Sequence, residues 1–145
     1  MDALGLHFPE DLWYLVEHQV WARLHDDGSA TVGITALGIR AAGEIYMCRP
    51  KSPGSEIEQG RSVAVVELAK SIVSVKSPVR GVVLERNERL EDVPELVHRS
   101  PYDEGWLARI RLADFAADRP ALLHGAAVPA AMAHHAWLNR IGDAE

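Results

Sequence analysis

Two runs of strand-forming residues, separated by a short break that contains one lysine, constrain the fold more than any other feature. Val65 and Val66 precede the break, and Ile72 and Val73 follow it. Strand-forming runs this close along the chain predict a β-hairpin. Because Ala69 does not favour a positive φ, we expect a type I turn at its tip and not a type I′ turn. Lys70 would then point into water, which suits a lysine that is covalently modified and presented to other proteins.

A similar order of residues stands on each side of Lys70. Segments 43–46 and 60–65 precede it, and segments 77–84 and 87–90 follow it. In both halves a glycine opens a β-branched run, and a polar turn then leads to another apolar residue. Internal similarity indicates one supersecondary unit used twice, although short Gly-Val-Val runs are common in all-β proteins. We therefore predict a mainly β fold: a flattened, pseudo-symmetric β-sandwich (barrel-sandwich hybrid) with short helices and a C-terminal α-helix.

Local signals place further elements along the chain. The Asp-Asp-Gly-Ser turn at 26–29 predicts a hairpin between strands over 20–24 and 30–34. Thr35 is expected to cap a short helix over 36–42.

The C-terminal third mixes strand and helix signals. Asp92 is expected to cap a one-turn helix over 94–97, and residues 106–112 alternate as a half-buried strand. A helix is predicted over 129–141, followed by Gly142 as its C′ residue. Its packing face is predicted to contain Trp137 as the anchor, together with Ala133 and Ile141.

Composition limits the classes of protein that this chain can belong to. Its 145 residues fit one domain, which we expect to have a core over about 12–113 and a helical extension over about 114–145. No apolar run approaches the roughly 20 residues that cross a bilayer, and the start lacks the basic region of a signal peptide. The single cysteine fits a reducing compartment, so we expect a cytoplasmic protein with no membrane partner.

The formal net charge is −6, and there is no long cluster of lysine and arginine. We therefore expect no nucleic-acid partner. A protein partner with a basic docking surface suits an acidic chain better.

Other residues that could carry chemistry have simpler explanations. Cys48 is expected to be a small buried residue, and adjacent His134 and His135 diverge on a helix, so no metal site is expected. Lys76, the nearest rival of Lys70, is expected in a strand as solvated surface. No nucleophile–base arrangement is readable. The acidic residues at 88–95 are expected to be a solvated face, and the four tryptophans, Trp13, Trp21, Trp106 and Trp137, core or edge-packing residues.

Four segments together resemble one family. They are Val32-Gly33-Ile34-Thr35, Ala42-Gly43-Glu44-Ile45, Glu67-Leu68-Ala69-Lys70, and Pro94-Glu95-Leu96-Val97 followed by Ser100-Pro101-Tyr102-Asp103-Glu104-Gly105-Trp106. In this order they resemble the H protein of the glycine cleavage system and its divergent relatives, which are carriers of lipoic acid.

The resemblance implies that Lys70 is acylated by lipoic acid, and that Glu67, Gly54 and Gly81 help a lipoate ligase or lipoyl transferase to find it. It implies no catalytic residue in the chain, which would be a monomeric carrier subunit of a multi-enzyme system. Its dihydrolipoyl group would be reoxidised by dihydrolipoamide dehydrogenase.

Two further features bear on the partner system. Ala69 before the lysine and the run Leu12-Trp13-Tyr14 resemble H-like lipoate-binding proteins of bacterial sulfur oxidation, which work with a heterodisulfide-reductase-like complex. We favour that subgroup. The alternatives are an H protein that carries the aminomethyl group of glycine, and an unlipoylated interaction protein of the same fold.

Overall fold

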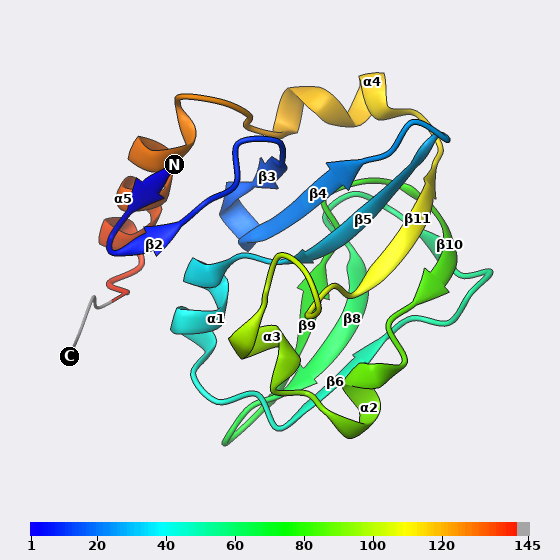
Figure 1. The fold of residues 1–145 in the computed structure, drawn as a ribbon, viewed down its shortest axis with the longest axis horizontal. Coiled ribbons are helices and arrows are strands. Elements are labelled where there is room, and N and C mark those ends of the chain that lie inside the picture. Colours follow the sequence, from blue (N-terminus) through cyan, green and yellow to red (C-terminus); the bar gives the residue numbers. More distant parts are fainter. Residues whose placement is uncertain (142–145) are drawn as a thin grey trace.

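The chain folds mainly into antiparallel β-sheets, as predicted, in a computed structural model that describes residues 1–141. A six-stranded sheet and a three-stranded sheet enclose the main core, and a two-stranded ribbon lies near the N-terminus (Figure 1). In order across the six-stranded sheet, the strands are β3 (Trp13–Leu15), β4 (Val20–Leu24), β5 (Ser29–Ile34), β11 (Ala108–Leu112), β10 (Gly81–Arg86) and β7 (Glu56–Ile57). The three-stranded sheet contains β6 (Met47–Pro50), β8 (Ser62–Glu67) and β9 (Ile72–Lys76), and the ribbon contains β1 (Asp2–Ala3) and β2 (Leu6–His7).

Short helices surround the sheets, and a longer helix stands beside the N-terminal ribbon (Figure 1). They are η1 (Val16–His18), α1 (Ala36–Ala42), α2 (Arg89–Asp92), α3 (Leu96–Arg99), α4 (Phe115–Asp118), η2 (Arg119–Ala121) and α5 (Val128–Leu138). Within residues 1–141, none of these helices has the length and apolar character needed to cross a membrane.

The predicted N-terminal hairpin and capped helix are confirmed. Strands β4 and β5 pair from Val20–Ile34 to Leu24–Ala30. Thr35 then begins α1, where its hydroxyl accepts a hydrogen bond from the Gly38 amide at 3.0 Å. The same hydroxyl donates to the Gln19 side chain at 2.6 Å, so the cap also ties α1 to the turn before β4.

The prediction that Asp92 caps a helix is wrong. Asp92 is the last residue of α2, and α3 begins at Leu96, preceded by Glu95, whose side chain makes no capping hydrogen bond. Pro94 explains the interruption, because the residue before a proline avoids helical dihedral angles. Val93 accordingly has φ −131° and ψ 66°, which separates two short helices.

The predicted packing face of the C-terminal helix is also wrong. Helix α5 buries Val128, Met132 and Ala136, whereas 74% of Trp137 is exposed. The helix is apolar on all sides, so its own periodicity does not select a face. It ends at Leu138, before the predicted end at Ile141, and Gly142 lies outside the described residues.

Two hydrophobic clusters form the interior. The larger cluster lies between the two main sheets and includes Val20, Val32, Val66 and Ile110. The smaller cluster joins α5 to the first strands and to α1, with Phe8, Leu12, Tyr14, Trp21, Leu37, Val128, Met132 and Ala136 as its buried members. Trp21 is a core residue, as predicted, while Trp13 and Trp106 are partly buried and pack against the clusters.

Candidate functional site

Strands β8 and β9 form the predicted hairpin around Lys70. Val66 pairs with Val73 and Glu67 with Ile72, and the Leu68 amide donates to the Ser71 carbonyl at 2.8 Å. Ala69 and Lys70 are therefore the two central residues of the turn. A type I′ turn requires positive φ at both central positions, and neither residue has it. The turn therefore agrees with the prediction that excluded type I′.

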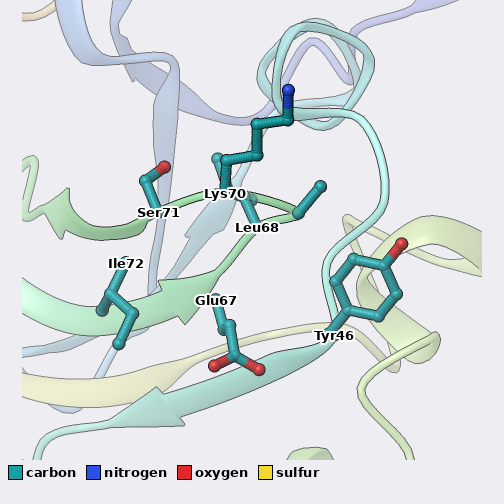
Figure 2. Close-up of a pocket in the computed structure, with 7 residues that line it drawn as sticks. Tyr46, Glu67, Leu68, Lys70, Ser71 and Ile72 are labelled. Carbon is teal, nitrogen blue, oxygen red and sulfur yellow. The ribbon is translucent and has the colours of Figure 1, made fainter.

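The Lys70 side chain is exposed at the hairpin tip. Figure 2 shows it extending to one side of the hairpin, while Glu67 and Ile72 point to the other side. Within residues 1–141, no carboxylate forms an ion pair with its ammonium group. The amine is accordingly accessible to an acylating enzyme.

Exposed apolar side chains flank this lysine. Tyr46 is 56% exposed and Ile72 is 63% exposed. Both line an open hollow of about 580 Å³, together with residues 67–71 of the turn (Figure 2). Tyr46 is positioned by its backbone amide, which donates to the Glu67 carbonyl at 2.9 Å. Exposed apolar residues that gather at one point are typical of a protein interaction site.

The sequence did not single out Tyr46 or Ile72. A signal existed for Ile72, because residues paired across a hairpin share a face and Glu67 is its partner. An apolar residue paired with a charged one on an exposed face does not contribute to the core. Tyr46 gave no such signal, since its position depends on how the segment after α1 reaches β6.

The structure brings only one of the three predicted ligase-recognition residues close to Lys70. Glu67 is exposed at the end of β8, three positions before the lysine. Gly54 and Gly81 lie at the opposite end of the sheets, where the Gly54 amide donates to the Val83 carbonyl at 2.8 Å and Gly81 pairs with Ile57. The five residues of β9 alone separate the two ends by roughly 15 Å. Recognition by a ligase stays a prediction for all three residues.

The predicted burial of Cys48 is confirmed, whereas Lys76 lies in a strand as predicted but is less exposed than the solvated surface expected for it. Cys48 is 1% exposed, and burial raises the pKa of its thiol to about 12, so it is no nucleophile near neutral pH. Lys76 is the last residue of β9, away from the turn, and is half-buried. No group of three or more potential metal-ligating side chains occurs among residues 1–141.

Comparison with known proteins gives consistent results. The family model described as "Glycine cleavage H-protein" matches residues 12–135. "Glycine cleavage system H protein 2" of Aquifex aeolicus is 40% identical over 121 residues, which cover 83% of this chain and 75% of that protein. "Glycine cleavage system H protein" of Marinobacter nauticus is 42% identical, over 73% of this chain and 81% of that protein.

A solved structure has a similar fold. The crystal structure of a glycine cleavage system H protein from Mycobacterium marinum superimposes with a TM-score of 0.73. The alignment covers 92% of this chain and 99% of that one, with 24% sequence identity. This likeness supports the β-sandwich architecture.

Proposed function

Because the chain belongs to the glycine cleavage H-protein family, we propose that Lys70 is its lipoyl attachment site and that the chain carries one-carbon units derived from glycine between enzymes. Members of this family carry lipoate covalently attached to a lysine. The observation that carries the proposal is the position of Lys70 at the tip of the β8–β9 hairpin, exposed and without an ion-pair partner within residues 1–141.

The residues around Lys70 fit a lipoyl group. The paired strands and the hydrogen bond between Leu68 and Ser71 hold the turn in a defined position, which a modifying enzyme needs. The open hollow beside Tyr46 and Ile72 leaves room for an acyl chain. Glu67 points away from the amine (Figure 2) and so leaves the path to it clear.

The chain's own contribution is presentation. When bound, the lipoyl group supplies a dithiolane whose sulfurs accept an aminomethyl group and later release electrons. The hairpin keeps the attachment point outside the core, so that the arm reaches several enzymes in turn, and tethering raises its effective concentration at each of them. The chain itself catalyses no step. Its expected partners are a lipoate ligase or lipoyl transferase, glycine decarboxylase, the aminomethyltransferase and dihydrolipoamide dehydrogenase.

A role in sulfur oxidation is the second candidate. It rests on Ala69 and on Leu12-Trp13-Tyr14, which resemble the lipoate-binding proteins of that process. The relatives reported above are all named after the glycine system, so the glycine alternative fits better than the heterodisulfide-reductase-like partner that we favoured from the sequence.

Mass spectrometry of intact protein and of its peptides, purified from the native host, tests the attachment site. We expect a lipoyl-sized adduct on the peptide that contains Lys70. Lys70→Arg should abolish the adduct, whereas Lys76→Arg, a matched change at the other end of β9, should retain it. An unmodified Lys70 in cells that lipoylate other proteins would leave the unlipoylated interaction protein as the better hypothesis.

Reconstitution with purified enzymes tests the partner system. The lipoylated chain should stimulate release of labelled CO₂ from carboxyl-labelled glycine by glycine decarboxylase from the same host, and Lys70→Arg should not. A lipoylated chain that gives no stimulation there, but is reduced or oxidised by a heterodisulfide-reductase-like complex, would favour the sulfur role instead.

A further inference from the structure

The outer face of the three-stranded sheet continues directly from the Lys70 hairpin. Residues paired across neighbouring strands share a face. One row on this face contains Met47, Glu67 and Ile72, and the next row contains Arg49, Val65 and Ser74. The opposite face of the same strands is turned to the core and holds buried Cys48 and Val66. A partner that covers this outer face lies beside the turn, on the side of the hairpin to which Glu67 and Ile72 point (Figure 2).

Positive side chains gather on this face and at its β6 edge. Arg49, Lys51 and Arg86 line an open hollow of about 310 Å³. Lys76 pairs with Ser62, one row further from the turn. Its two neighbours along the chain are buried, so the side chain of Lys76 lies on the outer face. We call these four residues, Arg49, Lys51, Lys76 and Arg86, the cationic face.

Few carboxylates neutralise this charge. Within the part of the chain that the structure describes, Arg49, Lys51 and Lys76 form no ion pair, and Arg86 has one contact of 3.9 Å with Glu88. Glu88, just before α2, and Glu91 within it border the face beside Arg49 and Arg86, where they line a smaller hollow of about 90 Å³. Of the residues in the two paired rows of the outer face, Glu67 alone is acidic.

The sign of this face is opposite to that of the whole molecule. The chain has a formal net charge of −6, which predicted a basic partner. Local charge at the contact determines which surfaces approach each other in a productive orientation. Arg49 pairs with Val65 and so lies at most five residues along the strand from the hairpin tip, a distance of roughly 16 Å. A standard interface of about 800 Å² per partner is roughly 30 Å across, so one interface can include both the cationic face and the Lys70 turn.

We propose that the cationic face docks onto a carboxylate-rich surface of an enzyme that receives the lipoyl arm, with Tyr46 and Ile72 seated at the mouth of that enzyme's active site. This proposal rests on the proposed function, because it takes Lys70 as the attachment point. Charge pairing sets the orientation and the rate of encounter, and the apolar residues form the contact next to the arm.

Charge reversal tests the proposal on the lipoylated full chain. The test variant is Arg49→Glu with Lys51→Glu. The matched control is Arg111→Glu with Arg119→Glu, two exposed arginines outside the cationic face whose reversal changes the net charge equally. The KM and kcat for each carrier are measured with purified glycine decarboxylase, aminomethyltransferase and dihydrolipoamide dehydrogenase from the same host, at several salt concentrations.

For at least one enzyme, the test variant should raise KM for the carrier about tenfold or more at low salt, with kcat changed less than about twofold, because orientation by charge affects encounter more than chemistry. The difference should shrink as salt rises. The control variant should change KM less than about twofold. Equal effects of the two variants on all three enzymes would overturn the docking proposal.

The outcomes separate this proposal from the proposed function. A wild-type chain that carries lipoate and is turned over, but shows no difference between the two variants, overturns docking alone. A wild-type chain without lipoate overturns both. Self-association at low salt in sedimentation measurements, lost in the test variant, would assign the cationic face to a second copy, through the acidic residues of its α2, and would overturn the choice of an enzyme partner.

Discussion

At the scale of single residues, Gly54 and Gly81 differ in what surrounds them. Both have positive φ, 90° and 156° respectively. A Cβ at Gly54 would meet no atom within 4 Å, whereas a Cβ at Gly81 would collide with the carbonyl oxygen of Arg111 and the side chain of Ile110. Gly81 is thus required by the close approach of β11, and Gly54 only by its backbone conformation.

We therefore expect Gly81→Ala to lower the free energy of unfolding by about 2–4 kcal/mol, since overpacking adds to backbone strain. Gly54→Ala should cost only about 1–2 kcal/mol. Urea denaturation of the two variants measures the difference. Similar losses in both would mean that the backbone near Gly81 moves to admit a methyl group.

The same variants address ligase recognition. Both glycines lie far from Lys70 along the sheets. If they act through the fold, lipoylation should fall only in proportion to the unfolded fraction. A fully folded Gly54→Ala variant with poor lipoylation would instead support a direct role in recognition.

At the scale of elements, α5 shows why a face cannot be chosen from an apolar helix alone. Met132 is fully buried, and the Gln19 side chain donates to its sulfur at 3.2 Å. Trp137 lies on the exposed side and stacks near His134, with ring centroids 6.1 Å apart. The larger aromatic side chain is not the anchor, because η1 and β1 present their surface to the other side of the helix.

Truncation of each side chain separates the two faces. Met132→Ala should lower the free energy of unfolding by about 2–4 kcal/mol through lost burial and a cavity, and Trp137→Ala should change it by less than about 0.5 kcal/mol. Thermal or urea unfolding, with circular dichroism as the signal, checks both values. The reverse order would place Trp137 in the interior and contradict the observed helix face.

At the scale of the whole molecule, both hydrophobic clusters depend on the same strand. Val20 and Ala22 of β4 point into the larger cluster, and Trp21 between them points into the smaller one. Loss of β4 would therefore disrupt both clusters at once. We therefore propose that the chain is one domain, with the C-terminal helical extension packed onto it.

This arrangement predicts one cooperative unfolding transition. Tryptophan fluorescence reports the smaller cluster through Trp21 and the larger one through Trp13, and far-ultraviolet circular dichroism reports the sheets. The two signals should give the same urea midpoint within error, as expected for two-state behaviour. Fluorescence that changes at clearly lower urea would indicate that the α5 region unfolds separately.

Local sequence alone determined the features that depend on neighbours along the chain. The hairpin around Lys70, the absence of a type I′ turn there and the Thr35 cap of α1 all follow from interactions within a few residues. These interactions form wherever the segment lies in the molecule. For the same reason the exposed lysine, the centre of the candidate site, was predictable from sequence.

Only the tertiary structure decided which distant residues become neighbours. The face of α5 depends on the surface that η1 and β1 offer, and the cationic face joins residues of β6, β9 and β10 that are separated in sequence. The net charge predicted a basic partner, because it does not tell where on the surface the individual charges lie. Strand register places side chains on a common face, and that placement determines where the charges of this protein are concentrated.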